Sequence, residues 1–156
     1  MKMVGIRSGK VCCEGLRDTI ELQDFYIAET EVTQQLWMAI IGNNPSSNQE
    51  CDSLPVECID LVECLEFVHK LDSVSGLDFY IPSYPQWVYA ANLGKCASVI
   101  PHSSKTFDDL AWWKNNSQEK THPVKDKAPN SLGIYDMSGN VSEWTISGSD
   151  PLFYVT

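Results

Sequence analysis

The most regular hydrophobic pattern lies in the middle of the chain. Five apolar residues recur there at the spacing of one helix face: Leu61, Cys64, Leu65, Val68 and Leu71. Asp60 precedes the segment as an N-cap and Gly76 follows it as a stop. The pattern predicts an amphipathic helix over residues 61–74. His69 stands beside the apolar face, where we expect a surface residue rather than a catalytic base.

Two shorter helices are predicted on either side of this one. Residues 34–41 (QQLWMAII) follow Thr33 as an N-cap and end at Gly42. Residues 84–94 (YPQWVYAANLG) follow Ser83 as an N-cap and include their own closing glycine, Gly94. Proline is well tolerated in the first turn of a helix, so the second position of this segment does not argue against it.

Extended segments separate these helices. Residues 25–32 (FYIAETEV) are rich in aromatic and β-branched side chains, which predicts a strand followed by a turn. Residues 77–82 (LDFYIP) also predict a strand. Weaker alternation near the N-terminus indicates short strands at Val11 with Cys13, or over residues 19–22. The chain as a whole therefore predicts short helices and scattered short strands joined by many turns.

Residues 95–113 carry no readable pattern. We expect one of the neighbouring Trp112 and Trp113 to anchor this region in the core, because successive side chains of an extended segment point in different directions. His122 precedes Pro123, which holds it extended. This histidine is either a site residue or a loop residue that positions neighbouring turns, and the second interpretation is favoured.

Length and charge narrow the function classes. A chain of 156 residues predicts one domain, and its 43% hydrophobic content is ordinary for a globular protein. The net charge of −10, from 21 acidic against 11 basic residues, argues against a nucleic-acid partner. No apolar stretch is long enough to span a membrane, and no signal peptide is visible. The expected compartment of the chain as written is therefore the cytoplasm.

Six cysteines occur, and their spacing does not form a pair of CxxC motifs, so a structural zinc site has little support. A domain with a substantial core does not need a disulfide framework. We expect most of these cysteines to be reduced and packed: Cys12, Cys13, Cys51, Cys58, Cys64 and Cys96.

The most informative segment is PNSLGIYDMSGNVSEW, residues 129–144. Turn formers alternate there with large apolar side chains, so the loop bends sharply and stays anchored. Its two carboxylates, Asp136 and Glu143, flank the turn SGN, and oxygen ligands gathered by a tight loop suit calcium. The alternative is that Asp136 bonds amides of its own turn and Glu143 is solvated or caps a helix. Chemistry alone favours that alternative.

The same segment resembles the signature of the formylglycine-generating enzyme family, the sulfatase-modifying factors. Four other blocks agree with the family in order, so the likeness covers roughly residues 20–145: FYIAETEVTQQLWMAIIG, LPVECIDLVECLEFVHKL, YIPSYPQWVYAANLG and NNSQEKTHPV. The resemblance implies an α+β, irregular C-type-lectin-like fold, with a short twisted antiparallel sheet, two or three helices and long loops.

The resemblance also implies a structural calcium site. The family's second calcium site maps onto the side chains of Asp136 and Glu143 and the backbone carbonyls of Gly139 and Val141. No equivalent of the family's first calcium site is recognisable in residues 95–113.

Activity is a separate question. Enzymatic members of the family oxidise a sulfatase cysteine to formylglycine with oxygen and a copper ion held by two cysteines, which lie well after this loop. No cysteine follows Cys96 here. Cys12 and Cys13 are adjacent and point apart in an extended strand, and Cys58 and Cys64 lie on segments that the family uses as scaffold. We therefore expect residues 1–156 to form a single family domain that lacks the family's C-terminal segment, has no catalytic residues and does not hold copper.

Two alternatives remain open. The chain is a fragment of an active oxidase, or it is a C-type-lectin-like protein that displays ligand-binding residues, with Phe153 and Tyr154 as possible contacts. The sequence names neither a protein partner nor a small ligand.

Overall fold

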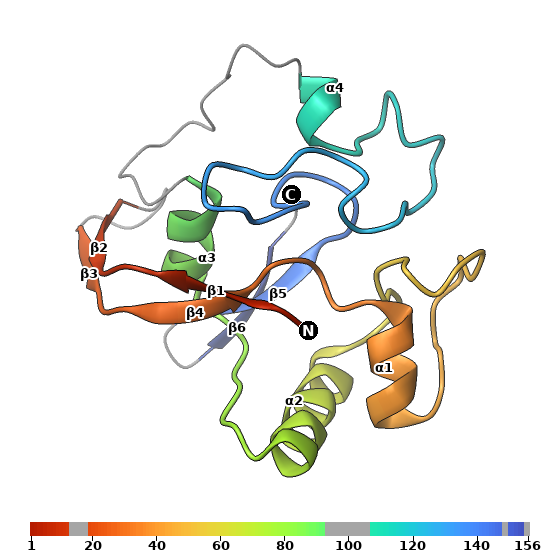
Figure 1. The fold of residues 1–156 in the computed structure, drawn as a ribbon, viewed down its shortest axis with the longest axis horizontal. Helices are drawn as coiled ribbons and strands as arrows, with labels where there is room; N and C mark the ends of the chain where they lie inside the picture. The colour runs from red at the N-terminus through yellow and green to blue at the C-terminus, as the bar shows by residue number, and fades with distance from the viewer. Residues whose placement is uncertain (13–18, 93–106, 148–149, 155–156) are drawn as a thin grey trace.

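The computed structural model describes residues 1–12, 19–92, 107–147 and 150–154. In chain order its elements are β1 (Met3–Ile6), β2 (Gly9–Val11), β3 (Ile20–Leu22), β4 (Phe25–Ala28), α1 (Gln34–Ile41), α2 (Leu61–Ser75), α3 (Tyr84–Ala91), α4 (Phe107–Leu110), β5 (Glu143–Ser147) and β6 (Asp150–Tyr154) (Figure 1). Long loops join the helices, and the expected α+β class is confirmed. None of the helices in these ranges has the length and apolar character needed to cross a bilayer.

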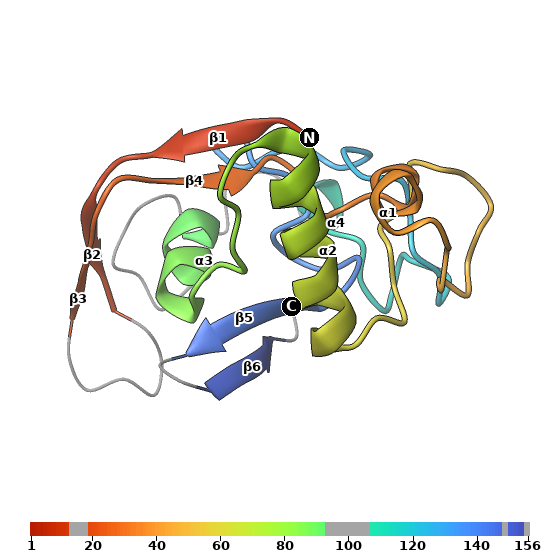
Figure 2. The ribbon, with the colours of Figure 1, turned by 90° about the horizontal axis from the view of Figure 1, so that it is seen from below.

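The strands pair in three short antiparallel ladders. β1 pairs with β4, with Ile6 opposite Phe25; β2 pairs with β3; and β5 pairs with β6. A parallel bridge between Ser83 and Ile146 joins the start of α3 to β5. Figure 2 shows the β1–β4 ladder on one side of the molecule and the β5–β6 ladder on the opposite side, with α2 and α3 between them.

The main core forms where α3 packs against the N-terminal strands. Its buried residues come from all of these elements and from the loop before β5: Ile6, Val11, Leu22, Phe25, Ile27, Trp87, Val88, Tyr89, Ala90 and Ile134. A Cβ on Gly9 would lie 1.9 Å from the hydroxyl oxygen of Tyr89, so only glycine permits this close approach. Each large side chain buried here contributes about 1.5–3 kcal/mol.

A second core joins α1 to α2. The rings of Trp37 and Phe67 stack with their centroids 5.1 Å apart and an interplanar angle of 7°. Leu71 and Val56 complete the buried cluster. The α2 face differs from the predicted one, because Leu65 is 48% exposed while Phe67 is buried. Phe67 lies three residues after Cys64 and four before Leu71, so it belongs to the same helix face.

The helix starts agree with the sequence. The Thr33 side chain accepts from the backbone N–H of Leu36 at α1, while α2 and α3 begin with capping boxes, Asp60 with Glu63 and Ser83 with Gln86. Gly42 and Gly76 adopt left-handed conformations and end their helices as predicted. α3, in contrast, ends at the cap residue Asn92, and Gly94 lies outside the described residues.

The strands predicted near the N-terminus form, whereas the strand predicted over residues 77–82 does not. β4 and β3 form within the predicted ranges, and β2 includes Val11, while Cys13 lies outside the described residues. Residues 77–82 form no strand. Their backbone makes isolated contacts instead: Phe79 N–H donates to Asp72 at 2.7 Å, and Ile146 N–H donates to the Pro82 carbonyl at 3.0 Å. Proline has no N–H to return, which prevents a continuous ladder.

Candidate functional site

The loop of residues 129–142 is fixed at its start by Asn130. The Asn130 side-chain nitrogen donates to the Ala90 carbonyl at 3.0 Å, which ties the loop to the end of α3. The side-chain oxygen accepts from the N–H groups of Leu132 and Ile134 at 2.9 and 3.2 Å. Ile134 is buried in the main core. The turn formers and apolar anchors of the sequence therefore act together, as predicted.

The tip of the loop is fixed against Trp112. Gly139 has φ of 84°, and a Cβ on it would lie 1.9 Å from the Trp112 carbonyl oxygen. The next residue, Asn140, donates its N–H to that same carbonyl at 2.8 Å. Trp112 in turn stacks on His122, with centroids 3.7 Å apart. Trp112 and Trp113 are both partly buried, and the enclosed indole nitrogen of Trp112 agrees with the prediction that one of the two anchors this region.

Asn140 connects the loop tip to two distant segments. Its side-chain oxygen accepts from the His122 N–H at 2.9 Å, and its nitrogen donates to the His122 carbonyl at 3.1 Å. The same nitrogen donates to Glu31 Oε2 at 2.8 Å, while Val141 N–H donates to Glu31 Oε1 at 3.2 Å. Glu31, which follows β4, therefore fixes the tip of the loop of residues 129–142 through these two bonds. The sequence patterns did not reveal this role.

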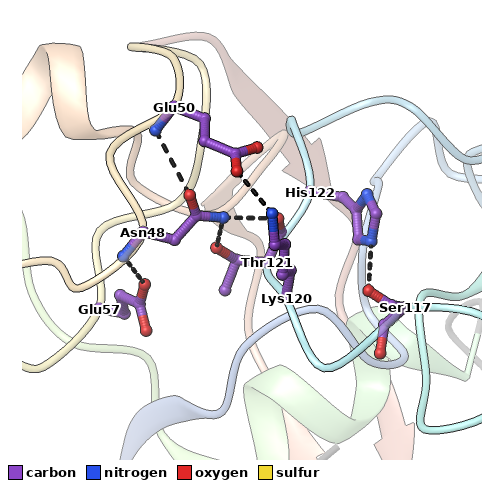
Figure 3. Close-up of polar contacts among 7 residues, drawn as sticks. All are labelled: Asn48, Glu50, Glu57, Ser117, Lys120, Thr121 and His122. Carbon is purple, nitrogen blue, oxygen red and sulfur yellow. Dashed lines mark hydrogen bonds and ion pairs between the residues drawn. The ribbon is translucent and has the colours of Figure 1, made fainter.

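His122 has a structural role in this arrangement. Figure 3 shows its Nε2 facing the carbonyl of Ser117, at 2.9 Å. In the same view Asn48 donates to the carbonyl and hydroxyl of Thr121, both at 3.1 Å, and Lys120 pairs with Glu50 at 2.6 Å. The contacts of Asn48 and Glu50 join loops about seventy residues apart in sequence. The bonds of His122 to Ser117 and Asn140 agree with its loop-positioning interpretation.

The carboxyl groups of Glu31, Asp136 and Glu143 lie near enough for their charges to interact. Burial is the main cause that raises the pKa of Glu31 well above its usual range, and the charges of Glu143 and Asp136 add to it. Burial likewise raises the pKa of Glu143 to about 7, opposed by a hydrogen bond from Trp87 and reinforced by Asp136. Glu143 as a residue is only half-buried, but its carboxyl group is enclosed.

Asp136 completes this group. It is 3% exposed, has φ of 55°, and accepts a hydrogen bond from the Lys125 N–H at 3.0 Å. Burial raises its pKa, against the effect of that hydrogen bond. Within the described residues, no ion pair reaches Glu31, Asp136 or Glu143. The site therefore gathers buried carboxyl groups away from any lysine or arginine of the described residues, and ionising such groups in place costs free energy.

Of the predicted calcium ligands, the structure relates only Asp136 and Glu143 to each other. Asp136 and Glu143 flank the turn that contains Gly139 and Val141, and their charges interact. In the part of the chain that is described, no group of three or more His, Cys, Asp or Glu side chains is arranged to hold a metal ion. Calcium binding here stays a prediction, because the expected set combines two carboxylates with two backbone carbonyls.

The cysteines differ in part from expectation. Cys12 is disulfide-bonded, while Cys51, Cys58 and Cys64 are free thiols. Cys51 and Cys58 are exposed rather than packed. Cys64 is partly buried on α2, and burial raises the pKa of its thiol to about 11. Cys13 and Cys96 lie outside the described residues.

An apolar cavity of about 540 Å³ opens beside Glu31 and Glu143. Its walls come from β4, α2, residues 56–59, residues 79–82 and the loop of residues 134–144. Glu31 and Glu143 are among its lining residues. A volume of this size falls within the range of about 300–1,000 Å³ that is typical of ligand sites.

Comparisons with known proteins place this arrangement in a family. Residues 2–151 match the family model described as the sulfatase-modifying factor enzyme 1-like domain. The chaperone protein LppX of Paenibacillus barcinonensis is 29% identical over 176 aligned residues, which cover 80% of this chain and 62% of that relative. This chain therefore spans less than two thirds of that relative's length.

Two solved structures share the fold. Treponema denticola variable protein 1 superposes with a TM-score of 0.79 at 27% identity, covering 92% of this chain and 71% of that chain. PvdO from Pseudomonas aeruginosa gives a TM-score of 0.74 at 20% identity, covering 92% of this chain and 69% of that chain, and shows the fold alone. The irregular C-type-lectin-like α+β fold implied by the sequence is confirmed.

Proposed function

Because the chain belongs to the sulfatase-modifying factor enzyme 1-like family, we propose that it is a non-catalytic family member, a binding module whose site loop is held by a structural calcium ion. The observation that carries the proposal is the group of buried carboxyls, Glu31, Asp136 and Glu143, which no lysine or arginine of the described residues neutralises.

Calcium fits the donor chemistry of this loop. Asp136 and Glu143 supply carboxylate oxygens, and the sharp turn between them offers the carbonyls of Gly139 and Val141. When bound, the ion supplies positive charge to carboxylates that are otherwise costly to bury. The chain's own residues then hold the loop: Glu31 fixes its backbone and Asn130 fixes its start.

Copper does not fit the described thiols. A Cu(I) centre of the oxidase kind needs two thiolates facing each other. The high pKa of Cys64 keeps that thiol protonated at neutral pH, and the Cys58 thiol lies 3.3 Å from the Ser47 hydroxyl oxygen. These environments support the proposed non-catalytic role for Cys58 and Cys64.

The remaining feature is the apolar cavity, which suits binding. The cavity is lined mainly by large apolar side chains with a few polar groups, which is typical of ligand-binding sites. One relative carries the name of a chaperone protein, a class of proteins that acts on other polypeptides. This supports a partner-binding role over chemistry on a small substrate.

Thermal unfolding with calcium and with a chelator tests the metal. We expect calcium to raise the melting temperature of the wild-type chain and to have no effect on Asp136→Asn. Asp78→Asn, which changes an exposed aspartate, serves as the control and should keep the calcium response. Equal melting temperatures of the wild type in calcium and chelator would exclude the structural calcium ion.

The absence of catalysis needs its own assay. The purified chain is loaded with copper and incubated aerobically with a sulfatase peptide that contains the target cysteine. Mass spectrometry should show an unmodified cysteine. Turnover to formylglycine would contradict the non-catalytic role and favour an active oxidase.

A further inference from the structure

We propose that the polar hollow between the loop of residues 47–50 and the loop of residues 117–121 binds an uncharged saccharide unit, either free or at the end of a longer glycan. The hollow has a volume of about 670 Å³ and is distinct from the apolar cavity, although Glu57, Thr121 and Asn140 line both. The inference goes beyond the proposed function, because it needs neither the calcium ion nor the apolar cavity.

The lining of the hollow is polar throughout. Every described residue in its wall carries a hydroxyl, an amide, a carboxylate or an ammonium group. The apolar cavity, by contrast, is lined mainly by large apolar side chains. A ligand in the hollow has to replace the bonds that these polar groups make to water, because polar groups that lose water without gaining a partner cost free energy. The ligand is therefore polar over its whole surface, as a saccharide is.

Hydrogen bonds centred on Asn48 fix the wall of the hollow before any ligand arrives. Its side-chain nitrogen donates to the carbonyl and the hydroxyl oxygen of Thr121, both at 3.1 Å, and its backbone N–H donates to Glu57 Oε1 at 2.9 Å (Figure 3). Buried Gln34 donates to the Asn48 carbonyl at 2.7 Å. Groups that are already held in place lose little conformational entropy on binding, which favours recognition through hydrogen bonds.

Donors and acceptors stand side by side in the hollow. Lys120 Nζ pairs with Glu50 Oε1 at 2.6 Å across the two loops, and both side chains are more than half exposed. The ammonium has further N–H groups to donate, and the second carboxylate oxygen is able to accept. Ser117 and Thr121, which also line the hollow, contribute hydroxyl groups. A sugar hydroxyl both donates and accepts, so neighbouring hydroxyls of one ring match this arrangement.

The charges of the hollow favour an uncharged ligand. An anion is disfavoured, because Glu50, Glu57 and Glu119 face a single lysine among the described lining residues and the chain carries a net charge of −10. A metal ion lacks a site, since no three acidic, histidine or cysteine side chains of the described residues are arranged to hold one. A small cation competes with Lys120 for Glu50, whereas a neutral sugar bonds to both groups and leaves their ion pair intact.

Saturation-transfer difference NMR with defined probes tests the class of ligand. The full 156-residue chain is mixed in turn with the methyl glycosides of glucose, galactose, mannose and N-acetylglucosamine, with their disaccharides, with glucuronic acid and with spermidine. We expect transfer to at least one neutral glycoside and saturable binding of it in a chemical-shift titration. A stronger response to the disaccharide identifies the end of a glycan, and an equal response identifies the free sugar. Transfer to no neutral saccharide, or equally tight binding of glucuronic acid or spermidine, would overturn the proposal.

Matched variants of two ion pairs locate the binding site. Glu50→Ala and Lys120→Ala should each weaken binding of the best sugar about five-fold or more, because each removes one bonding group. Both positions are exposed, so the fold should persist. Glu66→Ala and Lys70→Ala break an exposed ion pair on α2 that does not line the hollow, and they should keep wild-type binding. Unchanged affinity in both Glu50→Ala and Lys120→Ala would place the sugar elsewhere and contradict the proposal.

Two further measurements separate this site from the apolar cavity and from the calcium ion. Tyr80→Ser changes a residue that lines only the apolar cavity, so sugar binding should be unaffected, and its loss would assign the sugar to that cavity instead. Sugar binding is also measured in calcium and in chelator and should be equal in both. Binding that disappears in chelator while the chain stays folded would show that the ion holds the sugar, and would overturn the proposal. Equal binding without a calcium response of the melting temperature would retain this site and exclude the structural calcium ion.

Discussion

Glu29 and Glu31 lie two residues apart just after β4 and both are buried, yet of the two only Glu29 is paired with lysines of the described residues. Hydrogen bonds from Lys125 and Lys2 lower the pKa of Glu29, while burial beside two other carboxyls raises the pKa of Glu31. The first glutamate holds the N-terminal strand and the loop after His122 together. The second orients the loop before β5.

The lowered pKa of Glu29 predicts a loss of stability in acid. A carboxylate whose pKa is depressed in the folded state contributes stability above its unfolded pKa of about 4.3, and this is lost as the pH falls through the folded value. Between pH 5 and pH 3 the melting temperature of the wild type should therefore fall more steeply than that of Glu29→Gln. Glu21→Gln, which changes an exposed glutamate, is the control and should follow the wild type. Parallel pH profiles for wild type and Glu29→Gln would show that the lysine pairs contribute nothing.

The close contact between Gly139 and Trp112 predicts a strong effect of adding one methyl group. Gly139→Ala places a Cβ against the Trp112 carbonyl and keeps a left-handed backbone, so the free energy of unfolding should drop by about 3 kcal/mol or more. Gly133→Ala is the matched control: φ is 80°, but nothing lies within 4 Å of the added Cβ. It should cost only about 1–2 kcal/mol. Urea denaturation measures both, and similar losses in the two variants would contradict the close contact.

Asn140 should be more important than its position in a loop suggests. Asn140→Gly relieves the left-handed backbone, with φ of 62°, but removes the side-chain bonds to His122 and Glu31. Leaving those buried groups unsatisfied should lower the free energy of unfolding by about 2 kcal/mol. Gln118→Gly, with φ of 55° at an exposed position, is the control and should be neutral or slightly stabilising. The comparison is made by urea denaturation, where a neutral Asn140→Gly would show that water replaces the side chain.

The apolar face of α2 that packs on α1 can be tested by mutation. Phe67→Ala removes the ring that stacks on Trp37 and should cost about 3–5 kcal/mol. Leu65→Ala, which the hydrophobic pattern alone would rank as equally damaging, changes a side chain that is 48% exposed and should cost less than about 1 kcal/mol. Thermal and urea unfolding of the two variants compare them, and equal losses would restore the face expected from the sequence.

Signals from neighbouring residues in the sequence were sufficient to predict the helices but not to predict the contacts of the candidate site. Thr33, Asp60 and Ser83 cap their helices through bonds to residues within three positions, so the sequence contains the whole interaction. Glu31 is different, because its partners Asn140 and Val141 lie more than a hundred residues away. The available signal was the period-two spacing of Ile27, Glu29 and Glu31 in the sequence, which would place both acids on the buried face if the strand continued past Ala28.

The strand wrongly predicted at residues 77–82 also shows that contacts distant in sequence decide the structure. Aromatic and β-branched content favours an extended backbone, but a strand also needs a partner along its length. Here the only ladder contact comes at the end, between Ser83 and Ile146, within the described residues. The family resemblance supplied the fold and the position of the loop, while the charge balance around each carboxylate required the structure.

The thiols give the last prediction, because their environments differ within one short segment. Cys58 is exposed, whereas Cys64 is partly buried on α2 with a pKa of about 11. At neutral pH such a thiol carries roughly a hundredth of the thiolate of an ordinary cysteine, and the thiolate is the reactive form. Iodoacetamide should therefore alkylate Cys58 at least 50-fold faster than Cys64, as followed by peptide mass spectrometry. Exposed Cys51 provides the control rate and should match Cys58 within a few-fold. Rapid alkylation of Cys64 in the folded chain would mean that α2 opens readily to solvent, and the α2 wall of the apolar cavity would then be mobile.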